Sequence, residues 1–396
     1  MAVTRSAEAE AVLARLPPLI MGGAGFSYQL NSNPEALPAV EIIKGALDLG
    51  VRAIDTSPYY EPSEQIMGAA LCHPDITTKY QRSDYILITK AGRITEKKFD
   101  YSPAWIRKSI ARSLHRFGTD YLDVVFCHDV EFVSIEEVIE AVGTLFELSE
   151  SGVVRCVGIS GYSIDILVEA SQRILLKYGR PLDMVQVWAQ LTLQNTQLER
   201  KGLSALQKAG VRAVCSSSPL GAGLLRKGGV PLGALGNWHP APPELRAAAQ
   251  RAAEWVESQG DVLSSLALRF AIAKAQQNSS PGYTITTITG IGSISDLEEN
   301  VATARKVLRR KETAESDNSA SHSVGFDQSH TLDVEAVKRD ARLYEGVRKI
   351  LGSWLDFDFS ERPVVRSNGV GHGQQGQDAG SSQGTTSGSL NPVSRL

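Results

Sequence analysis

Between about residues 17 and 310, the sequence alternates short β-branched runs with longer stretches of helical periodicity. This alternation is typical of a parallel sheet built from βα units. Eight such runs occur, and eight strands that are each followed by a helix close into a barrel. The runs are Leu19–Gly22, Arg52–Asp55, Tyr85–Lys90, Val124–His128, Cys156–Ser160, Met184–Trp188, Ala213–Ser217 and Thr286–Gly290. We therefore predict an α/β fold, a TIM (β/α)8 barrel.

Two of the intervening segments carry clear helix-start signals. Ser102 is an N-cap residue that is followed by Pro103 at the first helical position. Ser134 and Glu137 have the spacing of a capping box. Apolar residues then recur at helical spacing in both segments, so we predict a helix after each cap.

Three segments do not follow the barrel pattern. We expect a short N-terminal extension over 1–15 and the barrel domain over 16–365. Inside that domain, 311–331 is rich in Ser, Asn, Asp and His, which predicts a mobile insertion ahead of a final helix around Val334–Leu355. The tail over 366–396 is rich in Gly, Ser and Gln and cannot bury enough apolar surface to order itself, so we predict that it is disordered.

Composition favours a small-molecule partner. The 41 Lys and Arg against 44 Asp and Glu give a formal charge of −3 without basic runs, so no nucleic-acid footprint is present. No stretch approaches the roughly 20 apolar residues of a membrane span, and acidic residues stand where a signal peptide would be apolar. Four widely spaced cysteines suit small buried hydrophobes in a reducing compartment. We expect a cytoplasmic protein with no membrane partner, either a monomer or a dimer.

Polar, titratable residues stand where three of the predicted strands run into loops. They are Asp55, Tyr60, Lys90 and His128. The carboxyl ends of barrel strands share one mouth, so these side chains should meet there. A tyrosine needs a neighbouring cation to act as a base near neutral pH; Lys90 can be that cation, and Asp55 can keep it charged. His128 can donate to a substrate oxygen and polarise a carbonyl.

Each of these residues alone has a simpler interpretation, such as a turn, a rim aromatic or a structural histidine, and only the joint pattern favours catalysis. No metal is expected, because Cys127 and His128 are strand neighbours that point to opposite faces. The short glycine pairs of 23–25 and 221–223 lack the G-x-G-x-x-G pattern of a Rossmann domain. Tyr162 likewise breaks the G-x-S-x-G elbow of a hydrolase.

In order, spacing and strand-end placement, Asp55, Tyr60, Lys90 and His128 resemble the catalytic tetrad of the aldo-keto reductase superfamily. The resemblance covers roughly Leu16 to Pro363. Three stretches are similar to its NAD-dependent sugar dehydrogenase branch, the D-arabinose and L-galactose 1-dehydrogenases. They are Gly22–Tyr28, Lys90–Arg93 and Cys127–Phe132.

The resemblance implies a dinucleotide that is bound extended across the barrel mouth. Ser160 and Gln186 match the residues that hold the nicotinamide carboxamide, whereas Gly161 stands where many relatives have Asn, so that contact must be absent or replaced. Ser217 replaces a tyrosine on which the nicotinamide often stacks. The implied cofactor contacts are Gly23, Ser160, Gln186, Ser217, Ser218, Pro219, Leu220, Gly221, Gly223, Gly290, Gly292, Ser293, Asp296, Glu299 and Asn300. The implied substrate contacts are Phe26, Tyr59, Arg93 and His128.

The same resemblance indicates NAD rather than NADP. Asp296 and Gly290 stand where NADP-preferring relatives have Arg and Lys. A carboxylate repels a 2′-phosphate and can accept hydrogen bonds from a free ribose hydroxyl. Arg305 and Lys306, a few turns further on, are the cations most able to reverse this preference.

The resemblance also implies the reaction, which is oxidation of a D-arabinose-like or L-galactose-like aldose at C1 to the aldonolactone. Three alternatives stay open from the sequence. They are an NADPH-dependent aldehyde or pyridoxal reductase on the same fold, a non-catalytic nucleotide-binding regulatory subunit, and a hydrolase.

Overall fold

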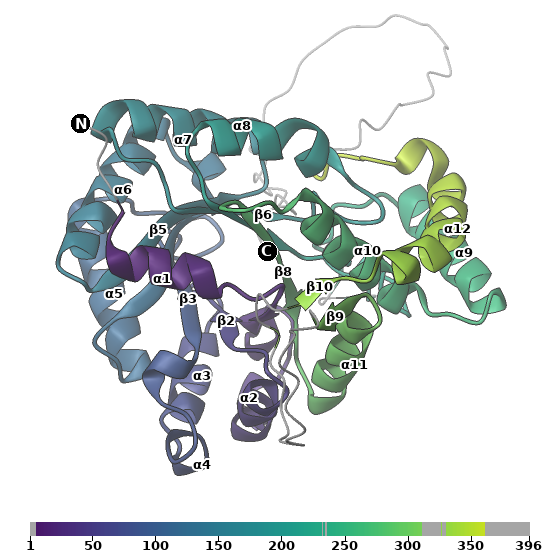
Figure 1. Ribbon diagram of the computed structural model, residues 1–396, viewed down its shortest axis with the longest axis horizontal. Coiled ribbons are helices and arrows are strands. Elements are labelled where there is room, and N and C mark those ends of the chain that lie inside the picture. Colours follow the sequence, from purple (N-terminus) through teal and green to yellow (C-terminus); the bar gives the residue numbers. More distant parts are fainter. Residues whose placement is uncertain (1–4, 232, 234–235, 311–325, 327–329, 361–396) are drawn as a thin grey trace, which may run out of the picture.

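Eight parallel strands form a closed barrel in which each strand pairs with the next and β8 pairs with β1 (Figure 1). The computed structural model describes residues 5–231, 233, 236–310, 326 and 330–360. The strands are β1 Leu19–Gly22, β2 Ala53–Asp55, β3 Ile86–Ala91, β4 Leu122–His128, β5 Val154–Gly161, β6 Met184–Trp188, β7 Ala213–Ser217 and β8 Thr284–Gly290. The predicted barrel is confirmed, and the strand ends differ by up to two residues because pairing with neighbours, rather than β-branched content, sets where a strand stops.

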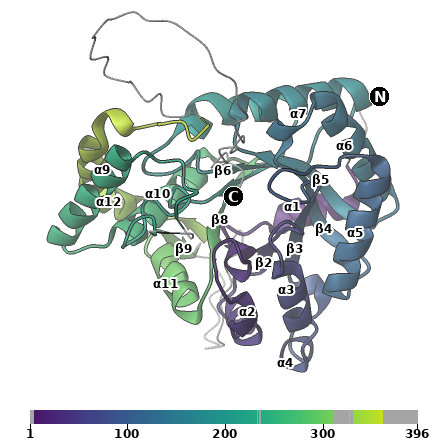
Figure 2. The same ribbon diagram turned by 180° about the vertical axis from the view of Figure 1, so that it is seen from behind.

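Helices surround the barrel in both views (Figures 1 and 2). They are α2 Ala39–Asp48, α3 Ser63–Leu71, α4 Pro74–Thr77, α5 Pro103–Phe117, α6 Ile135–Glu150, α7 Ile164–Tyr178, α8 Leu203–Lys208, α9 Pro243–Ser258, α10 Leu263–Asn278 and α11 Ile294–Arg305. Both predicted helix starts are confirmed, since Ser102 accepts from the N–H of Trp105 and Ser134 forms a capping box with Glu137. No helix in the described ranges is long and apolar enough to cross a membrane.

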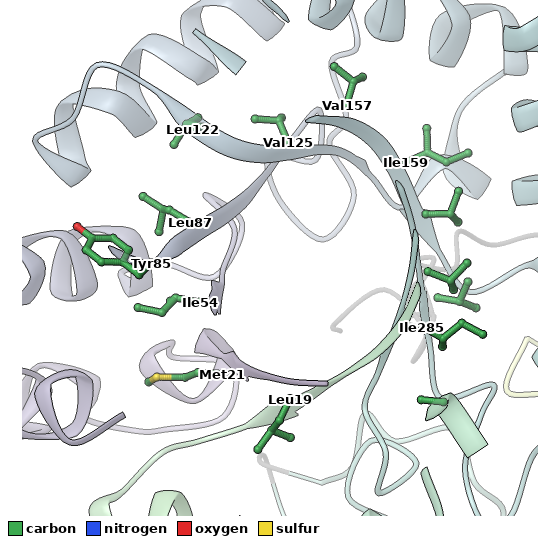
Figure 3. Close-up of a cluster of buried hydrophobic side chains, with 14 of the residues drawn as sticks. Leu19, Met21, Ile54, Tyr85, Leu87, Leu122, Val125, Val157, Ile159 and Ile285 are labelled. Atoms are coloured by element: carbon green, nitrogen blue, oxygen red, sulfur yellow. The ribbon is translucent and has the colours of Figure 1, made fainter. Parts of the chain in front are cut away.

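The alternation of side chains along each strand separates two apolar layers. Outward-facing residues pack against the helices, and Figure 3 shows Val157 and Ile159 among them. The inward-facing residues, such as Ile88, Phe126 and Cys156, form a separate interior cluster. Because alternate residues share a face, Lys90 and His128 continue the inward rows of Ile88 and Phe126. The strands therefore present their polar ends at the barrel mouth.

The N-terminal segment closes the interior cluster from the other end. Helix α1 (Ala7–Arg15) adds Val12 and Leu13 to that cluster and crosses the barrel in Figure 1. Arg5, just ahead of α1, pairs with Asp183 beside β6 at 2.7 Å. The predicted extension over 1–15 thus contains a helix that seals the barrel.

The last helix packs outside the barrel ring. Helix α12 (Val334–Leu351) lies against α9 in both views, and Arg269 of α10 reaches Asp340 of α12 at 2.6 Å. Strands β9 (Leu308–Arg310) and β10 (His330–Leu332) form an antiparallel pair just before α12. Most of the predicted insertion over 311–331 and all of the predicted tail over 366–396 lie outside the described residues.

Close packing of α3 on α5 gives a stability prediction. A Cβ placed on Gly68 would lie 1.9 Å from the carbonyl oxygen of Arg116, a backbone atom that moves only if α5 moves. Gly68→Ala should lower the free energy of unfolding by about 2 kcal/mol or more through overpacking, as measured by urea denaturation. Gly228→Ala is the control, because no atom of the described residues beyond its chain neighbours lies within 4 Å of the added Cβ. Equal stability of the two variants would contradict this account of the helix contact.

Candidate active site

Lys90 and Asp55 form a buried ion pair on the inner side of the barrel mouth. The Lys90 ammonium donates to both carboxylate oxygens of Asp55 at 2.8 and 2.9 Å and to the carbonyl oxygen of Thr56 at 2.9 Å. The two side chains are 1% and 5% exposed. All three ammonium donors are therefore used, which is the condition under which a buried charge is tolerated.

Tyr60 lies beside this pair but is not made acidic by it. The Lys90 nitrogen is 5.2 Å from the Tyr60 ring centroid. Burial raises the pKa of Tyr60 well above its usual 10, and the negative charges of Asp55 and Asp129 raise it further, although Arg93 acts in the opposite direction. The expectation that Lys90 supports a Tyr60 phenolate stays a prediction, and in this structure Asp55 compensates the ammonium charge. Tyr60 is a neutral phenol here.

His128 is held in one orientation by the loop after β2. Its Nδ1 lies 3.0 Å from the Ser57 hydroxyl, which also accepts from the N–H of Tyr59. Burial lowers the pKa of His128 well below 6.5, so the ring is neutral. Its Nε2 lies 3.5 Å from Asp129. These contacts favour the tautomer in which Nδ1 accepts from Ser57 and Nε2–H is the donor.

Arg93 and Asp129 form a second buried ion pair next to His128. The guanidinium lies 3.9 Å from the ring centroid of Tyr59. Tyr59 and His128 meet edge to face, with 5.7 Å between their centroids. Three of the four expected substrate contacts, Tyr59, Arg93 and His128, thus come together. The fourth, Phe26, is fully buried in the outer hydrophobic cluster, and its role as a substrate contact stays a prediction.

The expected carboxamide contacts lie on adjacent strands. His128 pairs with Ser160, and Ser160 pairs with Gln186, across β4, β5 and β6. Burial raises the pKa of Asp55, while Lys90 and a hydrogen bond from Gln186 act in the opposite direction. The Gln186 Oε1 is buried without a partner among the described residues. A buried amide oxygen without a partner is disfavoured, and a carboxamide N–H would satisfy this one.

The expected pyrophosphate loop follows β7 in a tight backbone conformation. Ser218, Gly221 and Gly223 have φ of 56°, 58° and 101°. The loop is fixed from behind by His239, whose Nε2 lies 3.0 Å from the Gly221 carbonyl oxygen. Pro219 and Leu220 lie within this loop, and Ser217 ends β7 just before it. Gly23 opens a short 3-10 turn after β1.

The expected adenosine segment starts α11. Ser293 caps the helix by accepting from the N–H of Asp296 at 3.0 Å, and Asp296 accepts from the N–H of Gly292 at 3.0 Å. Asn300 donates to the Gly290 carbonyl oxygen at 3.2 Å, which ties the helix to the end of β8. Glu299 is exposed one residue earlier.

Sequence reasoning overlooked three polar residues at this mouth. Ser57 was interpreted only as part of a turn, and no role was assigned to Asp129 or Glu131. Asp129 has φ of 59°, and a non-glycine residue with positive φ is uncommon enough to mark a constrained loop. Burial raises the pKa of Glu131 to about 8, and the charge of Asp129 adds to the shift.

The fold and the mouth together define a (β/α)8 oxidoreductase with a Tyr, Lys, Asp and His site. Residues 18–320 match the aldo/keto reductase family, and the chain belongs to that family. Its members use nicotinamide cofactors, and this protein is an oxidoreductase.

Among curated relatives, the chain is 38% identical to D-arabinose 1-dehydrogenase of Saccharomyces cerevisiae over 66% of this chain and 77% of that protein. It is 34% identical to L-galactose dehydrogenase of Arabidopsis thaliana over 76% of this chain and 83% of that protein. Among solved structures, the holo form of an aldo-keto reductase from Bacillus halodurans matches with a TM-score of 0.55 and 21% identity, over 83% of this chain and 91% of that one. That structural likeness supports the fold.

The buried carboxyl of Glu131 gives a pH prediction. Its folded pKa of about 8 lies above the ordinary 4.5, so the folded protein holds a proton that the unfolded chain releases. The stabilising effect of this proton is complete below about pH 4.5 and is lost as the pH rises to about 8. Glu131→Gln should therefore gain stability relative to the wild type across this window, by on the order of a few kcal/mol.

Urea denaturation at a series of pH values measures this difference. Glu150→Gln, which removes an exposed carboxylate at the end of α6, is the matched control. A constant difference between Glu131→Gln and wild type over the whole range would contradict the buried, protonated carboxyl.

Proposed function

We propose that this enzyme oxidises a cyclic aldose of the D-arabinose or L-galactose kind at C1 to the aldonolactone, with NAD as the hydride acceptor. The observation that carries the proposal is the convergence of Tyr60, His128 and the Lys90–Asp55 pair at the barrel mouth. Two curated relatives noted above, a D-arabinose 1-dehydrogenase and an L-galactose dehydrogenase, support an aldose as the substrate. Ser160 and Gln186 would hold the nicotinamide, which when bound would supply the acceptor for the hydride.

The protein groups act on the anomeric hydroxyl. His128 presents Nε2–H to the substrate oxygen and orients it, since Ser57 fixes the ring through Nδ1. Tyr60 takes the hydroxyl proton as the phenolate, with Lys90 and Asp55 beside it. Arg93 and Asp129 line the sugar site through the Tyr59 ring.

A second candidate, reduction of an aldehyde such as pyridoxal, is favoured by one observation. The raised pKa of Tyr60 makes it a neutral phenol, which can donate a proton to a carbonyl oxygen. A panel of D-arabinose, L-galactose, L-fucose and pyridoxal, assayed in both directions with each nicotinamide cofactor, distinguishes the two. Faster aldehyde reduction with NADPH than sugar oxidation with NAD would replace the first proposal. Binding of the cofactor without turnover of any substrate would indicate the regulatory alternative.

Tyr60→Phe should abolish sugar oxidation while leaving cofactor affinity nearly unchanged. In the wild type, the rate of oxidation should rise with pH, because the raised pKa means that the phenolate forms only under alkaline conditions. The measurements are kcat/KM across pH and the cofactor Kd by fluorescence. Substantial residual turnover in the variant, or a flat pH profile in the wild type, would remove Tyr60 from the role of base.

The choice of NAD follows from how Asp296 is used. A helix N-terminus is ordinarily a site for anions, but here the Asp296 carboxylate occupies it and accepts from Gly292. Arg305 lies nine residues further along α11, about 14 Å away at 1.5 Å per residue, and faces the Phe326 ring. The cations that could have reversed the preference are therefore at the far end of the helix.

Asp296→Asn should raise kcat/KM with NADP relative to NAD by about tenfold, because the like-charge repulsion of the 2′-phosphate is removed while an acceptor for Gly292 remains. Asp165→Asn, in the first turn of α7, is the control. A wild type that already prefers NADP would refute the assignment of the cofactor.

A further inference from the structure

Glu131 has a carboxyl group of which only one oxygen has a hydrogen-bond partner among the described residues. The residue lies in the 3-10 turn Val130–Phe132 that follows β4. Its Oε1 accepts from the N–H of Tyr162 at 2.8 Å. Its Oε2 is shielded from solvent and has no hydrogen-bond partner among the residues that the structure describes. A shielded acceptor of this kind costs free energy unless a ligand meets it.

The same oxygen occupies the space of a missing side chain. Gly161 ends β5, directly after Ser160. A Cβ on Gly161 would lie 2.1 Å from the Oε2 of Glu131 and 3.0 Å from its carboxyl carbon. Only glycine at position 161 leaves room for this carboxyl, so Glu131 takes the place of the side chain that Gly161 lacks.

The neighbours of this oxygen point to the ligand. Ser160 precedes Gly161, and Gln186 pairs with Ser160 across β5 and β6. The Oε1 of Gln186 is also buried without a partner in the described part of the chain. Two unpaired polar oxygens therefore lie beside neighbouring positions of β5 and β6, one at Gly161 and one on Gln186, where a ligand with amide donors would satisfy them.

We propose that Glu131, reaching over Gly161, hydrogen-bonds the carboxamide of the nicotinamide. The proposal rests on the proposed function only in that a nicotinamide dinucleotide is the cofactor. In this proposal, Glu131 selects for the nicotinamide carboxamide. The residue belongs to the turn after β4, and its carboxyl lies at the end of β5.

The protonation of Glu131 suits this role. Burial and the charge of Asp129 raise its pKa to about 8 against the hydrogen bond from Tyr162 and the charge of Arg93, so the carboxyl is neutral near pH 7. Tyr101 is the other titratable group nearby, and its phenol is neutral because burial raises its pKa well above 10. Because Oε1 accepts from the N–H of Tyr162, the proton is on Oε2, which can then donate to the carboxamide oxygen and accept from the carboxamide N–H through its remaining lone pair.

The test is a binding experiment on the intact protein. We expect Glu131→Ala to raise the Kd for NADH, read from its fluorescence, by about tenfold, the effect of one lost hydrogen bond. ADP-ribose, which lacks the nicotinamide, should bind both proteins equally. Wild type should prefer NAD to its 3-acetylpyridine analogue, which has no amide N–H, and the variant should lose this preference.

A rescue separates the contact from a merely structural role. Gly161→Asn alone should bind NADH poorly, because its Cβ collides with the Glu131 carboxyl. Adding Glu131→Ala to Gly161→Asn should recover NADH affinity to within about threefold of wild type, since an amide then stands at position 161. Glu131→Gln, which keeps the shape, gives a second comparison with wild type if the alanine variant does not fold.

The proposal is overturned if Glu131→Ala changes NADH and ADP-ribose binding equally, or if Glu131→Gln, which keeps a donor and an acceptor at this place, weakens NADH binding as much as Glu131→Ala does. It is also overturned if the wild type binds the 3-acetylpyridine analogue as tightly as NAD, or if the double variant does not recover. All these readouts are affinities, so they stand even if no aldose is oxidised. Failure of the sugar assay with intact carboxamide selectivity would reject the proposed function alone.

Discussion

The ion pair between Lys90 and Asp55 is the constraint on which the mouth of this barrel depends. A buried ammonium is tolerated only when its charge and its donors are matched, and Lys90 meets this condition through Asp55 and the Thr56 carbonyl. These contacts join the end of β3 to the end of β2, and so they set where the following loop begins. That loop carries Ser57, which orients His128, and Tyr60, which packs against it. One pair thus positions the remaining catalytic candidates.

Charge compensation also determines the protonation states at the mouth. Lys90 forms an ion pair with Asp55, and Arg93 forms one with Asp129. The positive charge of each cation is therefore compensated by its carboxylate. Tyr60 and Glu131 lie in the same low-dielectric region, and both keep their protons because burial and the neighbouring carboxylates disfavour a further negative charge. His128 is neutral because the two cations and burial act against its protonation. The site therefore contains two compensated ion pairs and the neutral side chains of Tyr60, His128 and Glu131.

Much of this arrangement could be predicted from the sequence, because strand alternation and the shared mouth of a parallel barrel are local rules applied eight times. These rules predict that Asp55, Lys90 and His128 lie close together even when the loop conformations are unknown. The contacts that escaped prediction join loops from different strands, as in the Arg93–Asp129 pair and the bond from Tyr162 to Glu131. The substrate role expected of Phe26 stays a prediction for the same reason, since this residue lies in the 3-10 turn after β1 and outside the repeating strand pattern.

At the end of β5, the polar group beside position 161 comes from a neighbouring loop, because the carboxyl of Glu131 fills the space next to Gly161. A side chain at position 161 and the carboxyl of Glu131 cannot occupy the same space, since a Cβ there would lie 2.1 Å from Oε2. Substituting either residue alone therefore leaves a collision or an empty position, and each state is disfavoured in a packed site. Only a joint exchange keeps one polar group at this place, so the two positions are energetically coupled through a single volume. A glycine at the end of β5 is thus informative about a residue thirty positions earlier, in a loop that periodicity does not describe.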